Sequence, residues 1–64
     1  MVKVGNIYTD GVTIYLIDKV LDDGSVVAQI CSGSPASFSP IAGASVTLSP
    51  EKLELYKKIG KVND

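Results

Sequence analysis

Residues 12–21 are the most constraining part of this sequence, because they have the pattern of one long strand with two apolar faces. Successive side chains of a strand point to opposite faces of its sheet. The two faces consist of Val12, Ile14, Leu16, Asp18 and Val20 on one side and Thr13, Tyr15, Ile17, Lys19 and Leu21 on the other. A small domain with one core needs only one apolar face. The segment therefore predicts either a strongly bent barrel strand that serves the core with both faces, or a second face buried against another chain through Tyr15, Ile17 and Leu21.

The length of the chain bears on this choice. Its 64 residues suffice for one domain, which we expect to span residues 1–64. A domain of this size is marginally stable unless disulfides, a metal, oligomerisation or unusually good packing support it. One cysteine and no histidine exclude an internal disulfide and a closed zinc site. Packing and self-association remain, and we expect a homo-oligomer without metal or cofactor.

The charge balance limits the partners and the compartment. Six basic and seven acidic residues give a net charge of −1, so no strong basic field gathers nucleic acid or anionic lipid. The longest uncharged apolar run, residues 12–17, is too short to span a membrane, and no secretory signal is visible. With its single thiol, the chain is expected to be a cytoplasmic protein without a membrane partner.

Shorter elements are expected on both sides of residues 12–21. Residues 2–8 predict a first strand that Gly5 interrupts, and Thr9-Asp10-Gly11 predicts a turn. The sequence Asp22-Asp23-Gly24-Ser25 is typical of a hairpin turn and leads into a strand over residues 26–31. Residues 32–44 are almost all small, with two prolines and two glycines, and predict a long mobile loop. A short strand at residues 45–48 and a frayed tail at residues 60–64 complete the prediction.

The sequence Ser49-Pro50-Glu51 is a helix-start signature, with a serine cap, a proline in the first turn and an acid behind it. Two continuations compete. Leu53, Tyr56 and Ile59 would give a helix that runs to Gly60. Alternatively, a single short turn leads into a fifth strand with Leu53, Leu55 and Ile59 pointing inward. We favour the turn and strand, because a fifth strand would cover an edge of the sheet.

This layout resembles an SH3-like small barrel of about five short strands with one short helical turn near the C-terminus. The opening Val4-Gly5-Asn6-Ile7-Tyr8 is similar to the Val-Gly-Asp-x-Val start of many such barrels. The stretch from Val46 to Tyr56 is similar to their closing strand, turn and strand. The resemblance covers most of the chain, and its motifs are generic.

Three groups of proteins share this layout, and each implies a different function. KOW and Tudor-like modules bind nucleic acid or protein tails, and peptide-binding SH3 domains bind protein segments. In type II dihydrofolate reductases, four chains form one active pore lined by Val-Gln-Ile-Tyr, where this chain has Val46-Thr47-Leu48-Ser49. The opening Ala-Leu-Tyr-Asp-Tyr and the tryptophan of peptide-binding SH3 domains are also missing here. By analogy, the small size and the lysine-only basic set suit an accessory protein of a mobile element.

Catalytic chemistry has few candidate groups in this sequence. Cys31 has no histidine to act as its base, so we expect a packing role. Asp22 and Asp23 lack the spacing of a calcium loop and fit a solvated turn. Asp10 and Asp18 fit surface charges better than an acid and base pair. We therefore predict no catalytic residues.

The sequence contains more candidate binding residues than candidate catalytic residues. Phe38 is the one large aromatic residue among the small residues 32–44, with Ile41 close by. It either tucks back onto the core or projects to a partner. The predicted protein-binding residues are Phe38, Ile41, Tyr8, Tyr15 and Tyr56, and the predicted self-association residues are Tyr15, Ile17 and Leu21.

The sequence thus predicts a small non-enzymatic interaction module that self-associates and binds a protein partner through residues 32–44. One alternative is a nucleic-acid-binding barrel that uses the tyrosines and the C-terminal lysines Lys52, Lys57, Lys58 and Lys61. A second alternative is an oligomeric pore enzyme similar to type II dihydrofolate reductases.

Overall fold

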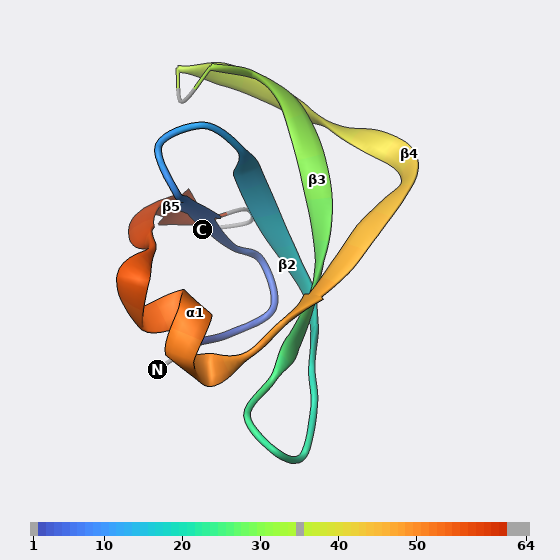
Figure 1. Cartoon of the computed structure of the whole chain (residues 1–64). Coiled ribbons are helices and arrows are strands. Elements are labelled where there is room, and N and C mark those ends of the chain that lie inside the picture. The colour runs from blue at the N-terminus through green and yellow to red at the C-terminus, as the bar shows by residue number, and fades with distance from the viewer. Residues whose placement is uncertain (1, 35, 62–64) are drawn as a thin grey trace.

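The computed structural model describes residues 2–34 and 36–61, which form one antiparallel sheet and one short helix (Figure 1). The strands of this part of the chain are β1 (Asn6–Thr9), β2 (Ile14–Val20), β3 (Val26–Ser34), β4 (Ser37–Leu48) and β5 (Lys57–Lys61). The helix α1 (Pro50–Leu55) connects β4 to β5. The predicted all-β class, with a short helical segment near the C-terminus, is confirmed.

The strand order is β4-β3-β2-β1-β5, and every neighbouring pair is antiparallel. The chain runs as a meander from β1 to β4, and β5 returns to pair with β1. Within the described residues no pairing joins β4 to β5, so the sheet is open and these two strands are its edges. The sheet is strongly curved, and β4 bends sharply near its middle (Figure 1). A closed barrel is not confirmed.

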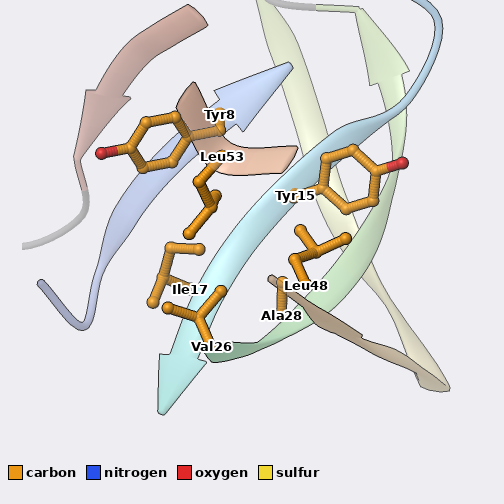
Figure 2. Close-up of a cluster of buried hydrophobic side chains, with 7 residues drawn as sticks. All are labelled: Tyr8, Tyr15, Ile17, Val26, Ala28, Leu48 and Leu53. Carbon is orange, nitrogen blue, oxygen red and sulfur yellow. The ribbon is translucent and has the colours of Figure 1, made fainter. Parts of the chain in front are cut away.

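One face of the sheet holds the main hydrophobic cluster, shown in Figure 2. Its buried members are Tyr8, Tyr15, Ile17, Val26, Ala28, Leu48 and Leu53. They come from β1, β2, β3, β4 and α1, so the helix covers this face of the sheet through Leu53. Burying each larger aliphatic side chain contributes about 1.5–3 kcal/mol, which makes this cluster the principal source of stability.

A second, smaller cluster lies on the opposite face. Its buried residues are Ile7, Ile14 and Cys31, and the partly buried Leu16, Phe38 and Ile59 pack against them. In β2, the residues of the second cluster alternate with the residues of the main cluster, as the side-chain alternation of a strand requires. Over residues 14–17, both faces of this strand therefore pack against side chains of the same chain, whereas Val20 at its end is 42% exposed.

Residues 32–44 differ from the predicted loop. Residues 32–34 and 37–44 belong to β3 and β4, which pair with each other up to Ser34 and Ser37. Small residues hide this hairpin from sequence patterns, because serine, alanine and glycine carry little strand preference. The predicted turn at residues 22–25 is confirmed: the Leu21 N–H donates to the Ser25 carbonyl oxygen at 2.8 Å, and Gly24 has a positive φ of 91°.

The first strand is shorter than predicted, because residues 3–6 form a turn. The Asn6 N–H donates to the carbonyl oxygen of Lys3 at 3.1 Å, and Gly5 has a φ of 93°. Val4 is therefore exposed, whereas the period-2 pattern predicts a strand position. Of the predicted frayed tail at residues 60–64, Gly60 and Lys61 belong to β5, and residues 62–64 lie outside the described residues.

The predicted helix start and fifth strand are both present. Ser49 caps α1, with its hydroxyl oxygen accepting from the Lys52 N–H at 3.3 Å, and Pro50 begins the helix. The segment is a six-residue α-helix rather than the single short turn that we favoured. Leu53 points into the main cluster, but Leu55 is 83% exposed, so its predicted inward position is wrong. Leu55 ends the helix instead of entering β5.

Candidate interaction surface

Phe38 lies on β4 in the hairpin that β4 forms with β3, opposite Gly33. It is partly buried and packs against the second cluster, which also contains Cys31 of β3. Of the two expectations for this residue, tucking back describes its place in the structure. Phe38 thus packs the end of the hairpin onto the second cluster, and only part of its side chain is exposed to solvent.

Residues 41–44 form a bulge in β4. Pro40 pairs with Cys31 and Ser45 pairs with Gln29, so four residues of β4 between these positions have no register partner in β3. Gly43 has a positive φ of 79°, a conformation that glycine adopts without strain. The bulge carries Ile41, whose side chain is 42% exposed. It is an apolar projection on an edge strand that has no charged residue.

The three tyrosines belong to the main cluster rather than to the hairpin surface. Tyr8 and Tyr15 are buried members, and Tyr56 packs against them from the residue after α1. The rings of Tyr15 and Tyr56 are stacked, with centroids 5.3 Å apart and planes inclined by 11°. In Figure 2 the hydroxyl groups of Tyr8 and Tyr15 point away from the aliphatic residues between them. This arrangement leaves one stacked aromatic pair at the rim of the main cluster.

Asp10 connects this aromatic pair to the turn that precedes β2. One of its carboxylate oxygens accepts from the N–H groups of Val12 and Thr13 at 2.9 and 2.7 Å. The other accepts from the Tyr15 hydroxyl at 3.2 Å. The backbone N–H of Thr13, followed by that of Val12, lowers the pKa of Asp10, and burial raises the pKa of Tyr15. This carboxylate is therefore committed to holding the turn.

The predicted protein-binding residues consequently divide among three places. Tyr8, Tyr15 and Tyr56 share the main cluster, Phe38 lies in the second cluster, and Ile41 lies on the bulge. The structure does not bring these five side chains onto one surface. Ile41 is the most exposed of the five side chains.

The residues predicted for self-association occupy the core side of β2 or its end. Ile17 is 1% exposed and Tyr15 is nearly as buried, both inside the main cluster of one chain. Leu21 follows β2, and its N–H closes the hairpin turn with Ser25. The first two side chains therefore offer almost no surface to a second chain, although self-association itself stays a prediction.

The C-terminal lysines lie on the last two elements. Lys52 is on α1, and Lys57, Lys58 and Lys61 are on the edge strand β5. Lys58 pairs with Tyr8 and Lys57 pairs with Thr9 in the register with β1. Two of the three tyrosine rings that a single-stranded nucleic acid would stack on are buried, because Tyr8 and Tyr15 belong to the main cluster.

The remaining chemical candidates have structural roles. Burial raises the pKa of the Cys31 thiol, which keeps it in the less reactive protonated form. Asp23 accepts from the Ser25 N–H at 2.9 Å, and this hydrogen bond lowers its pKa within the hairpin turn. Within residues 2–34 and 36–61, no group of acidic or cysteine side chains has the geometry of a metal site, and no cavity is present.

Sequence reasoning missed two features of this surface. The first is the second cluster, because the alternation in residues 12–21 reveals two apolar faces but not what covers each of them. The second is the edge position of β4, which follows from the strand order. One signal was available: residues 24–50 contain no charged residue, and charged side chains are among the features that protect edge strands.

Comparison of the chain with family models, with curated proteins and with solved structures finds no match. In the part of the chain that the structure describes, no helix has the length and apolar character to cross a bilayer.

Proposed function

We propose that this chain is a small non-enzymatic interaction module of SH3-like barrel type, which self-associates and binds a protein partner in the cytoplasm through its β3–β4 hairpin. The observation that carries the proposal is the bulge at residues 41–44. It presents Ile41 on an uncharged edge strand, which is unlike the charged surface of the other edge strand, β5.

The composition of the hairpin supports a protein partner. The charge-free segment of residues 24–50 includes all of β3 and β4. An exposed apolar side chain within small and polar neighbours fits the anchor and rim of a protein interface. A highly charged partner such as nucleic acid would find no counter-charge on this hairpin.

The chemistry of the chain supports a binding role over a catalytic one. The sequence has no histidine, and its thiol is buried with a raised pKa, so the usual bases and nucleophiles are not poised for reaction. In the stretch Val46-Thr47-Leu48-Ser49, Leu48 is buried in the main cluster and Ser49 caps α1. Because these two side chains stabilise the fold of a single chain, they are not available to line a pore like that of the type II reductases.

The strand order supports the SH3-like interpretation. Four strands follow one another as an antiparallel meander, a short helix follows, and the last strand returns to the first. The sheet is also strongly curved, as Figure 1 shows.

The test compares two substitutions of exposed apolar residues. The full chain is immobilised, and proteins captured from a lysate of its source cells are quantified by mass spectrometry. Ile41→Asp is expected to reduce capture of the specific partner by about tenfold or more, because it places a charge at the anchor. Val12→Asp is the matched control, since Val12 is 92% exposed on the turn before β2 and outside the hairpin.

Two results would contradict the proposal. Equal capture by wild type and the Ile41→Asp variant would show that the bulge is not the binding surface. Capture of nucleic acid that falls steeply with added salt would favour the lysine-bearing edge instead. Circular dichroism of each variant confirms that the sheet is retained.

A further inference from the structure

The two edges of the sheet are guarded very differently. An edge strand presents unpaired N–H and C=O groups, and proteins protect such strands with lysines, prolines, bulges or a covering element. The edge strand β5 carries three lysines in five residues. The edge strand β4 has twelve residues and no charge. Two protective features are present in β4, Pro40 and the bulge at residues 41–44. Both lie on the N-terminal side of residue 45.

These two features leave one part of β4 open. Residues 45–48 pair with residues 26–29 of β3 in uninterrupted register, and each of the four has an N–H group. Alternate N–H and C=O groups of such a strand point away from β3. Among the described residues, no backbone hydrogen bond outside the ladder with β3 involves residues 45–48. We call this stretch the 45–48 edge.

The side chains of the 45–48 edge are suited to pairing with the same edge of a second copy. Val46 is partly buried at the rim of the main cluster, and Ser45 and Thr47 are exposed on the opposite face. A two-fold axis perpendicular to a sheet pairs two identical edges as antiparallel strands with their faces aligned. In the register centred on Val46, this residue lies opposite the partner's Val46, and Ser45 lies opposite the partner's Thr47. Pairs of β-branched and of hydroxyl side chains both stabilise neighbouring antiparallel strands.

We propose that two copies of the chain pair through the 45–48 edge, so that β4 of one copy continues the sheet of the other. This deepens the self-association of the proposed function and rests on it, while moving the contact from β2 to β4. A second copy is the fitting occupant because an uncharged edge meets no like-charge repulsion when it faces itself. The assembly closes as a dimer, since the two-fold uses up this edge and lysines guard the other.

The bulge sets the extent of the contact. It ends regular pairing at residue 44, so the seam is only a few residues long and buries a small area. Interfaces of this size are at the weak end of the range for specific complexes. The dimer therefore forms at high protein concentration and dissociates on dilution.

The test is the mass in solution of the full chain, measured by light scattering over a dilution series. The wild type is expected to approach twice its 6.7 kDa at high concentration. Thr47→Lys is expected to weaken dimerisation by about tenfold or more, because it brings two ammonium groups near the two-fold axis. Ser39→Lys is the matched control, with the same change at an exposed position of β4 beyond the bulge, and it leaves the dimer intact.

A charge pair tests the register itself. The double variant Ser45→Glu with Thr47→Lys places a carboxylate directly opposite each ammonium across the seam, so dimerisation returns toward the wild-type level. Should Thr47→Lys fail to fold by circular dichroism, Ser45→Glu alone supplies the like-charge test at the same seam.

The outcomes separate this proposal from the proposed function. A dimer that Thr47→Lys leaves unchanged would overturn the 45–48 edge and retain self-association elsewhere. A wild type that stays at 6.7 kDa at every concentration would overturn both the edge and self-association. Partner binding at Ile41 is decided separately by the capture experiment.

Discussion

At the scale of single residues, the carboxylate of Asp10 accepts three hydrogen bonds. The donors are two backbone N–H groups of its own turn and the hydroxyl of Tyr15. Tyr15 in turn stacks on Tyr56, which follows α1. One exposed acid therefore links a surface turn to the rim of the main cluster.

Acidification is predicted to release this turn. The hydrogen bonds favour the charged form, so the pKa of Asp10 in the folded chain lies below its ordinary value of 3.8. The unfolded chain then binds the proton more readily, and stability increases with pH through this window. The contribution of Asp10 is present above pH 3.8 and is lost as pH falls through the folded-state pKa.

The measurement is a nuclear magnetic resonance titration of the Val12 and Thr13 amide signals. We expect both signals to move with a midpoint below 3.8 in the wild type. Asp10→Asn removes the titrating group and is expected to abolish that movement. A midpoint at or above 3.8 would contradict the hydrogen-bonded turn.

The thiol of Cys31 is predicted to be protected. It is buried in the second cluster and its pKa is raised by burial, so both access and the thiolate fraction are reduced. Alkylation by iodoacetamide at neutral pH is expected to be slow in the native chain and fast in denaturant. The rate is followed by intact mass, and equal rates in both conditions would show that the cluster is open.

At the scale of elements, the end of the β3–β4 hairpin depends on Gly33. This residue has a φ of 110°, and a Cβ atom there would collide with the Ser37 carbonyl oxygen and lie 3.0 Å from the Cα of Phe38. Close backbone approach and a positive φ are both roles for which glycine is suited. The hairpin thus turns back closely enough to bring Phe38 onto the second cluster.

Two glycine substitutions separate the effect of backbone strain at a positive φ from the effect of a steric clash on the free energy of unfolding. Gly33→Ala is expected to reduce the free energy of unfolding by about 2 kcal/mol or more, because it adds a clash to the unfavourable φ. Gly43→Ala is the control, with a φ of 79° and no atom within 4 Å of the added methyl group. It is expected to cost about 1 kcal/mol. Urea denaturation measures both, and equal losses would contradict the close approach at Gly33.

The N-cap of α1 is predicted to contribute to the stability of the fold. The Ser49 hydroxyl oxygen accepts from the Lys52 N–H, and α1 places Leu53 in the main cluster. Ser49→Ala is expected to lower the free energy of unfolding by about 1 kcal/mol. Ser39→Ala, at an exposed serine of β4, is expected to be nearly neutral. If thermal melts give the two variants the same stability, the cap contributes nothing to the stability of the fold.

Local signals predicted the turns and the helix start, whereas long-range pairing had to be observed. The Asp-Gly turn before β3 and the Ser-Pro start of α1 are set by neighbouring residues, and both are present. The hairpin over residues 32–44 was missed, because small residues become a strand only when β3 is beside them. For the same reason, Ile41 was predicted as a binding residue without its position on a bulge, and the edge exposed by β4 was not foreseen.

At the scale of the whole molecule, the two clusters explain how a chain of 64 residues folds with no disulfide. The main cluster is covered by α1, and the second is covered by the curled hairpin through Phe38. β2 is the middle strand of the sheet, and it contributes residues to both clusters. The charged residues lie outside residues 24–50, so the hairpin is uncharged and its outer strand, β4, is an uncharged edge of the sheet.

In the proposed dimer, the molecule associates through its uncharged β4 edge. The most direct measurement is a comparison of backbone amide signals of the isotope-labelled wild type at high and low concentration. We predict that the concentration-dependent shifts concentrate on residues 45–48, with little change at Lys57, Lys58 and Lys61 of β5. Shifts confined to β5, or signals that do not change with concentration, would contradict association through this edge.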